Sequence, residues 1–210
     1  MAAIFDRSDP ASPLAHDASK TALILLDFQG FAVDRCGLDG RAALNKAQVI
    51  RDWAVSREIV VIHSIADVAA KPSRHVKGAN RLVKMLAGIE NNRTAAEESP
   101  EIAPRGRGEE YVVLKPPGVV SGFKSVGILE LLHEHGIESL VLCGLKTSGA
   151  VLWTALAASD DGFVVSVISD ACADLDTAMH ENLMSTVLQS RGHVCTAERF
   201  ISEWSKEMSE

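Results

Sequence analysis

Two charged residues stand at the ends of apolar runs that read as strands. Asp27 ends the run ALILLD, and Lys115 ends the run YVVLK. Ligands of an open parallel sheet bind outside the carboxyl ends of its strands, so both side chains are expected at one edge. A carboxylate and an ammonium at one place can transfer a proton and stabilise a developing charge. The pair therefore predicts acid–base chemistry at that edge.

A third candidate segment joins a strand to a helix. Residues 146–150 read KTSGA, with the apolar run LVLCGL before them and VLWTALAA after them. Many enzymes place a nucleophile on such a turn, and the N–H groups that begin the helix suit an oxyanion. The place on this turn that we expect to be most exposed holds Ala150. Residue types alone leave open whether the turn is a site without a nucleophile or a tight connection.

Other polar residues have simpler interpretations. Asp170 ends the run VVSVISD, but a helix cap or a solvated edge explains it better, because Asp174 and Asp176 also resemble helix-start residues. Ser148 is interpreted as an N-cap and not as a nucleophile. The four cysteines form no CxxC pair and are expected to be reduced and mostly buried. With no HExxH motif and no Asp-x-His pair, we expect no metal and no cofactor.

Short β-rich runs alternate with helical periodicity from about residue 21 onward, which is typical of a parallel sheet with crossover helices. Most strand runs are apolar at successive positions, as expected when helices cover both faces of the sheet. Strands are expected at residues 21–28, 58–65, 111–115, 139–145, 163–169 and, more weakly, 192–198. Helices are expected at residues 40–57, 125–136, 147–162 and 176–192.

Residues 66–110 interrupt this alternation with one helix near residues 77–86 and otherwise polar, proline-bearing loop. A long loop in a compact domain is usually functional or mobile. We interpret the segment as bordering the site, with a plain surface excursion as the alternative. Residues 1–20 are expected to be an N-terminal extension and residues 21–210 a single domain.

Composition limits the partners. The net charge is −7, the pI is near 5.5 and no cluster of basic residues exceeds a pair, which argues against nucleic acid and anionic membrane. No apolar run approaches the roughly 20 residues of a membrane span. The N-terminus lacks the apolar stretch of a secretory signal, so a cytoplasmic location is expected. A small-molecule substrate is the expected partner.

Three blocks carry a family resemblance: TALILLDFQ, then YVVLK followed by SGF, then GIESLVLCGLKTSGAVLWTALAASDDGFVVSVISDACAD. In this order, over roughly residues 20–200, the chain resembles the isochorismatase-like (cysteine hydrolase) superfamily. The resemblance implies a Rossmann-like, three-layer α/β/α fold with a six-stranded, mostly parallel sheet. It also implies a homodimer or a larger homo-oligomer.

The family's usual triad is an aspartate, a lysine and a cysteine. Carried over to this chain, the aspartate falls on Asp27, the lysine on Lys115 and the cysteine on Ala150. The resemblance further implies a cis peptide around Lys146 and Thr147. Alanine has no heteroatom, so an acyl-enzyme at position 150 is chemically excluded. The chain thus resembles a cysteine-less subgroup. An engineered replacement of the cysteine by alanine would give the same residue at position 150.

Isochorismatases hydrolyse a vinyl ether and do not require that cysteine. The resemblance implies that Asp27 is the acid and that Lys115 orients it or holds the carboxylates of a small anionic substrate such as isochorismate. Hydrolysis would then yield a dihydrodiol acid and pyruvate. Expected substrate contacts are Phe31, Lys146, Thr147, Ser148 and Gly149. Arg74, Arg81 or Lys146 could supply positive charge.

Some questions stay open at this stage. Five residues separate Lys115 from Ser121, more than the family's usual short spacer, which puts the reach of the lysine in question. Burial would raise the pKa of Asp27 while a neighbouring ammonium would lower it. The alternatives to vinyl-ether hydrolysis are a catalytically inactive protein that binds a metabolite or a protein partner, and an amide or C–N hydrolase of the cysteine hydrolase type.

Overall fold

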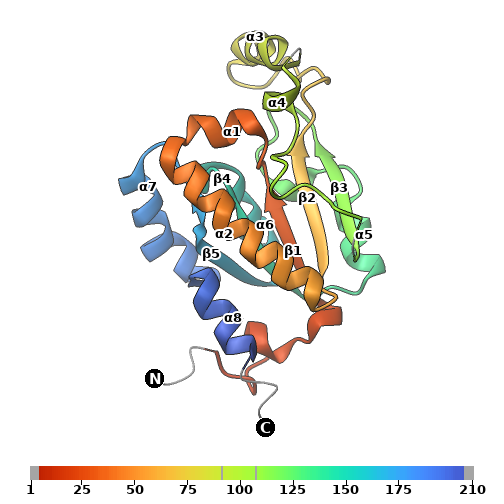
Figure 1. Cartoon of the computed structure of the whole chain (residues 1–210), viewed down its shortest axis with the longest axis vertical. Coiled ribbons are helices and arrows are strands. Elements are labelled where there is room, and N and C mark those ends of the chain that lie inside the picture. Colours follow the sequence, from red (N-terminus) through yellow and green to blue (C-terminus); the bar gives the residue numbers. More distant parts are fainter. Residues whose placement is uncertain (1–4, 91, 107, 206–210) are drawn as a thin grey trace.

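Six parallel strands form one sheet in the order β3-β2-β1-β4-β5-β6 (Figure 1). The computed structural model describes residues 5–90, 92–106 and 108–205. The strands are β1 (Thr21–Leu26), β2 (Val60–Ala66), β3 (Glu110–Lys115), β4 (Ser139–Leu145), β5 (Val164–Ala173) and β6 (His193–Cys195). Helices lie on both faces of this sheet, so the expected three-layer α/β/α fold is confirmed.

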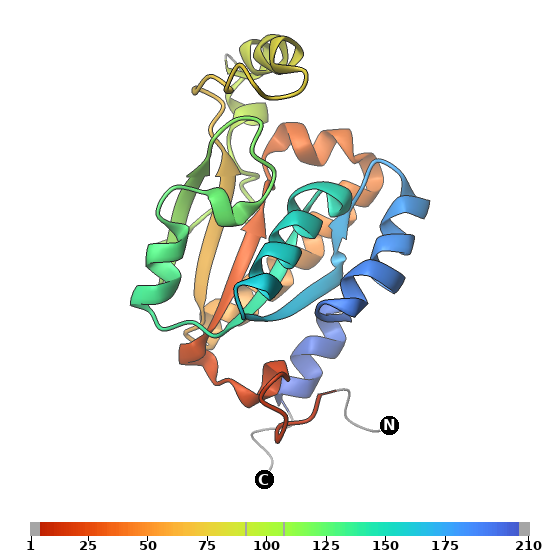
Figure 2. The same cartoon turned by 180° about the vertical axis from the view of Figure 1, so that it is seen from behind.

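The apolar core is divided by the sheet into two clusters. One cluster lies under α1 (Gly30–Arg35), α2 (Gly37–Ser56) and α8 (Ala197–Ser205). The other lies under α5 (Ile128–Glu134), α6 (Leu152–Asp160) and the turns η5 (Leu183–Val187) and η6 (Leu188–Ser190), on the face that Figure 2 turns to the reader. The remaining elements are η1 (Pro13–Ala15), η2 (Ala18–Lys20), α3 (Ala79–Glu90), α4 (Arg93–Ala96), η3 (Gly122–Lys124), η4 (Thr147–Val151) and α7 (Thr177–Asn182).

Burial on both faces explains why the central strands have no polar alternation. Every residue of β1 and every residue of β4 is buried. In β1, Leu23 and Leu25 enter the cluster under α2, while Ile24 and Leu26 enter the cluster under α6. Since each side chain meets a helix, apolar residues are favoured at every position.

The structure corrects the position expected for Asp170. It does not end a strand, because β5 continues through a register shift in its pairing with β4 and ends only at Ala173. The Oδ1 atom of Asp170 accepts a hydrogen bond from the N–H of Ala197 at 2.8 Å, at the start of α8. The helix-cap interpretation of this aspartate therefore agrees with its contacts.

Three helices were not expected from the sequence: α1, the four-residue α4 and α8. α1 has six residues and follows Asp27 after a short connection. α8 buries Phe200 and Trp204, and rings from the N-terminal segment and α2 surround Phe200. The helix expected at residues 176–192 is broken into α7, η5 and η6. Short helices of this kind depend on tertiary packing, which local periodicity does not report.

The N-terminal segment lies against the domain. Phe5 and Leu14 are buried in the cluster under α2 and α8. The expected extension covers residues 1–20, and its first residues lie outside the described ones. The expected domain end at residue 210 also lies outside them. The boundary at residue 20 stays a prediction. In the part of the chain that the structure describes, none of the helices combines the length and the apolar character that crossing a bilayer requires.

The side chain of Gln29 ties the segment of residues 66–110 to the start of α1. Its Nε2 donates to the carbonyl oxygens of Ala66 at 3.1 Å and Ala96 at 2.6 Å, and its Oε1 accepts from the N–H of Ala66 at 2.8 Å. The N–H of Gly30 donates to the carbonyl of Glu97 at 3.1 Å. A Cβ on Gly30 would overlap the carbonyl oxygen of Thr94, so only glycine permits this approach.

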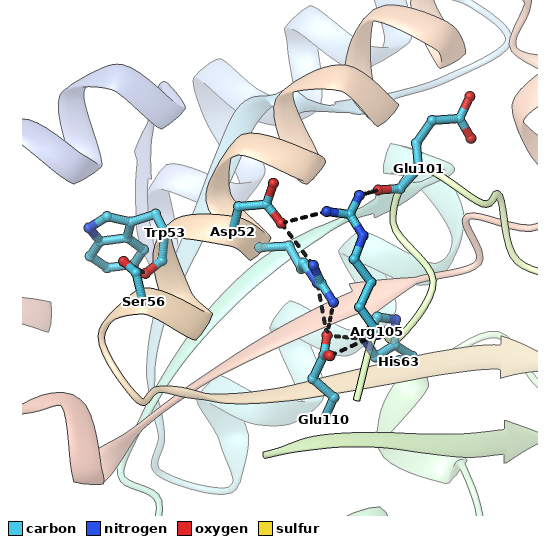
Figure 3. A network of polar contacts seen from close by, with 8 residues as sticks. Asp52, Trp53, Ser56, His63, Glu101, Arg105 and Glu110 are labelled. Carbon is cyan, nitrogen blue, oxygen red and sulfur yellow. Dashed lines mark hydrogen bonds and ion pairs between the residues drawn. The ribbon is translucent and has the colours of Figure 1, made fainter. Parts of the chain in front are cut away.

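A buried ion network joins α2, β2 and β3 (Figure 3). Nε of Arg51 donates to Oε1 of Glu110 at 2.8 Å, and both side chains are almost fully buried. The fully buried ring of His63 lies between two carboxylates, with Nδ1 2.8 Å from Oε2 of Glu98 and Nε2 3.5 Å from Oε1 of Glu110. Because Glu98 belongs to the 66–110 segment, the network anchors that segment and the first residue of β3 together.

Replacing Glu110 by glutamine is expected to lower the free energy of unfolding by about 3 kcal/mol, because the Arg51 guanidinium would keep its charge in a site closed to water. Chemical denaturation at neutral pH measures this loss. Glu109→Gln is the matched control, since the side chain of Glu109 is 58% exposed and its removal should cost less than about 0.5 kcal/mol. Equal losses in the two variants would contradict the anchoring role of Glu110.

Candidate active site

Asp27 follows the last residue of β1 in a backbone conformation that few side chains adopt. Its φ is +56°, in the left-handed region, where aspartate and asparagine are tolerated better than most residues. Its N–H donates to the carbonyl of Ser64 at 3.0 Å. A Cβ on Gly144 would overlap Leu26, so β4 packs against the end of β1 through a glycine. Main-chain packing thus fixes where the carboxylate of Asp27 lies.

Lys115, the last residue of β3, reaches Asp27 across β2. Its Nζ donates to Oδ2 of Asp27 at 2.5 Å and to the carbonyl of Val120 at 3.2 Å, and the lysine side chain is 3% exposed. The five-residue spacer therefore does not prevent the contact. Val120, the last residue of that spacer, supplies the second acceptor for the ammonium.

The environment of Asp27 favours its protonated form. Burial raises the pKa of Asp27 above its ordinary value, and the charge and hydrogen bond of the Lys115 ammonium lower the pKa by less. Oδ2 faces the ammonium, whereas Oδ1 is buried and has no hydrogen-bond partner among the described residues. Oδ1 is thus the oxygen that can carry a transferable proton.

The turn at the end of β4 begins with a cis peptide between Leu145 and Lys146, one residue before the place implied by the family resemblance. η4 follows, and Gly149 departs from helical geometry within it. Three N–H groups of the turn are already used: that of Ser148 donates to Asp174, and those of Gly149 and Val151 donate to the carbonyl of Lys146. These three groups cannot serve an oxyanion without breaking those bonds.

Thr147 and Ser148 hold the turn in place and are not among the residues that line the cavity beside Asp27. The hydroxyl of the fully buried Thr147 lies 2.7 Å from Nδ1 of His180. The N–H of Ser148 donates to Oδ2 of Asp174 at 2.6 Å, and the N–H of Leu175 donates to Oδ1 at 2.7 Å. Burial opposes ionisation of Asp174, but these hydrogen bonds outweigh burial and lower its pKa.

A cavity of about 210 Å³ connects the site residues. Six residues predicted from the sequence line it: Asp27, Phe31, Lys115, Lys146, Gly149 and Ala150. The others are Ala32, Arg35, Cys36, Val119, Val120, Leu145 and Leu175. Arg74 and Arg81, considered from the sequence as sources of positive charge, are not among them. Arg35 was missed, although its spacing of four from Phe31 would place both on one face of a helix.

Cys36 brings a thiol to the cavity that sequence reasoning treated as a core residue. Burial raises the pKa of Cys36, so the thiol stays protonated and is a poor nucleophile. All four cysteines are free and buried. Burial raises the pKa values of Cys172 and Cys195 to about 12. Among the described residues, no three His, Cys, Asp or Glu side chains gather as a metal site requires.

Comparisons with known proteins identify the family and the fold. The isochorismatase domain model matches residues 21–199. Maleamate amidohydrolase from Pseudomonas putida is 28% identical over 186 residues, which cover 85% of this chain and 84% of the relative. An isochorismatase-like hydrolase from Alkaliphilus metalliredigens superposes with a TM-score of 0.68 at 26% identity, covering 88% and 99% of the two chains. A cysteine hydrolase from Pseudomonas syringae shares the fold, with a TM-score of 0.70 at 18% identity over 91% and 95% of the chains.

Asp174→Asn tests how the turn is held. The variant is expected to lose about 1.5–3 kcal/mol of unfolding free energy at neutral pH, because a charged acceptor is replaced by a neutral amide. Since the folded-state pKa of Asp174 is lowered, its contribution is complete above the unfolded-state pKa of about 4 and is lost as the pH falls through the folded-state value. Denaturation from pH 7 to pH 3 should show the difference between variant and wild type shrinking. A difference independent of pH would contradict this role.

Proposed function

The chain belongs to the isochorismatase family of hydrolases, and we propose that it hydrolyses the vinyl ether of isochorismate, or of a closely similar small acid, without a covalent enzyme intermediate. The observation that carries the proposal is Asp27, whose pKa is raised and whose Oδ1 is free. This acid lines the same cavity as Ala150, where the turn offers a methyl group and no nucleophile. The family's cysteine is proposed to correspond to this position.

In the first step, the proton on Oδ1 of Asp27 passes to the terminal methylene carbon of the enol ether. The electron pair of the C=C bond forms the new C–H bond, and the ether oxygen shares the positive charge as an oxocarbenium ion. Asp27 becomes a carboxylate in this step. The ammonium of Lys115, 2.5 Å from Oδ2, stabilises that carboxylate as its charge develops.

In the second step, water adds to the oxocarbenium carbon and returns a proton to Asp27. The hemiketal that results breaks its bond to the ether oxygen, which takes up the proton that the hemiketal hydroxyl loses, and pyruvate and the dihydrodiol acid leave. One water is consumed, no redox change occurs, and the acid is regenerated. The reaction does not need an oxyanion hole for a tetrahedral amide intermediate, which fits the N–H groups of the turn that are already occupied.

Asp27→Asn tests the acid. Asparagine keeps the shape of the side chain and tolerates the left-handed backbone, so the fold should persist. We expect pyruvate release from isochorismate to fall about 100-fold or more, the contribution typical of a positioned acid. Asp34→Asn is the matched control, because that aspartate lies on α1 with 72% of its side chain exposed and outside the cavity. Equal rates for Asp27→Asn and wild type would refute the mechanism.

The pH profile gives an independent test. Because the acid must be protonated, kcat/KM should fall as the pH rises through the raised pKa of Asp27. A coupled assay for pyruvate over pH 4 to 9 measures this profile. A rate that increases with pH would point to a base as the essential group. Ligand binding without any turnover in the wild type would favour the catalytically inactive alternative.

Amide hydrolysis is the second candidate, because a relative matching most of the chain is by its name a maleamate amidohydrolase. The usual route needs a thiolate, and the thiol of Cys36 stays protonated by burial. Ala150→Cys should therefore release ammonia from maleamate or nicotinamide, whereas the wild type should not. Ala150→Ser is the control, because serine is similar in size to cysteine but has no thiol, and this variant should release no ammonia. Amide turnover by the wild type would favour this second function.

A homodimer or a larger homo-oligomer is part of the same proposal. Its support is the edge strand β3, whose side chains Val112 and Leu114 are exposed on the same face of the sheet. Single exposed apolar residues are ordinary, but several in one region are costly in water. Light scattering of the purified protein measures the assembly directly.

A further inference from the structure

The charges that line the cavity do not balance. Asp27 is the only carboxylate among its described lining residues, and it is already paired with Lys115. Arg35 and Lys146 also line the cavity, and no ion pair joins either of them to a carboxylate in the described ranges. The thiol of Cys36 is neutral. The cavity therefore carries two cationic groups, Arg35 and Lys146, beyond the Asp27–Lys115 pair.

Arg35 lies in the last turn of α1, one turn after Phe31, and is exposed. Its Nη1 donates to the sulfur of Met85 on α3 at 3.6 Å, which is a weak acceptor. A guanidinium has five N–H donors in a planar fork that matches a carboxylate with two parallel hydrogen bonds. Hydrogen bonds of Gln29 and Gly30 hold the start of α1 against the 66–110 segment. The backbone that carries Arg35 is therefore fixed in position.

Lys146 approaches the same cavity from the turn after β4. It is exposed, and its aliphatic chain passes beside Gly149, where a Cβ would be in ordinary contact with Cε of Lys146 at 3.7 Å. The charge of Lys146 lowers the pKa of Asp174, but both oxygens of that carboxylate already accept main-chain hydrogen bonds. Arg35 and Lys146 line the same cavity as Cys36, and their charges lower the pKa of its thiol while those of Asp174 and Asp39 raise it.

We propose that Arg35 and Lys146 form a two-point clamp that selects small dicarboxylates, with Arg35 as the residue that determines specificity. Arg35 binds one carboxylate through its planar fork, and Lys146 binds the second as a point charge. The bond to be broken is then held beside Oδ1 of Asp27. A volume of about 210 Å³ lies below the range of roughly 300–1,000 Å³ usual for sites of drug-sized ligands, which restricts the ligand to a small metabolite.

The clamp rests on the proposed function in one respect, the placing of the reacting bond beside Asp27. Charge selection itself does not depend on which bond is cleaved, so binding can be measured without turnover. Three molecules of nearly equal size separate charge from shape: maleate carries two carboxylates, maleamate one, and maleamide none. Isothermal titration calorimetry of the wild-type protein with each of them, at low ionic strength, gives three dissociation constants.

The dissociation constant is expected to increase at least tenfold from maleate to maleamate and again from maleamate to maleamide. In Arg35→Met, maleate should bind at least tenfold more weakly, and the preference for maleate over maleamate should nearly vanish. Arg35→Lys should recover part of the affinity, because it restores the charge without the planar fork. Arg41→Met is the matched control: it removes one cation from the neighbouring helix α2, outside the lining residues, and should leave all three constants unchanged.

Two results would overturn the clamp: equal binding of maleate and maleamide by the wild type, or equal binding of maleate by Arg35→Met and the wild type. Isochorismate turnover separates this inference from the proposed function. Charge-ordered binding that depends on Arg35, with no pyruvate released, would keep the clamp and reject vinyl-ether hydrolysis. Pyruvate release with an unchanged KM in Arg35→Met would keep the reaction and reject the clamp.

Discussion

The contact between the ammonium of Lys115 and the carboxylate of Asp27 is the interaction on which the arrangement of the site depends. The two residues lie on strands that do not touch, because β2 separates β1 from β3. Their contact requires the register in which Leu26 pairs with Ser64 and Lys115 pairs with Ala66. The first residue of β3, Glu110, is bound by Arg51 of α2. An edge strand that could otherwise slide is thus held by an ion pair at each end.

The same contact explains how one carboxyl group acquires two unlike oxygens. Oδ2 is compensated by a cation, and Oδ1 is buried without a hydrogen-bond partner among the described residues. Burial dominates the balance, so the group holds its proton more tightly than an aspartate in water. The left-handed backbone of Asp27 adds strain that the packing of Gly144 against Leu26 and the hydrogen bond to Ser64 sustain. Burial therefore sets the protonation of this carboxyl group, and main-chain packing sets its position.

The sequence predicted the sheet because a buried parallel strand has a local signature, a continuous apolar run between turns. It predicted Asp27 and Lys115 as neighbours because the carboxyl ends of parallel strands lie at one edge of the sheet, independently of how the helices pack. The prediction that Asp170 ends a strand was wrong, because only the pairing of β5 with β4 shows that the strand continues past this charged residue. Arg35 and Cys36 were missed because α1 is too short to show periodicity, and its position depends on contacts with a segment more than 60 residues later in the chain. Residue patterns report local preferences, whereas the wall of this cavity is formed by long-range packing.

The hydrogen bonds of Gln29 have a consequence for how the chain can change. One amide side chain holds Ala66 and Ala96, so the two ends of the intervening segment are fixed by the domain and not by the segment itself. The entropy of closing a loop grows only slowly with its length. Residues 67–95 can therefore be shortened, lengthened or exchanged at modest cost in stability, while the acid at the end of β1 stays where it is. None of the described residues of this segment lines the cavity beside Asp27, so exchanging the segment does not replace any wall residue of that cavity.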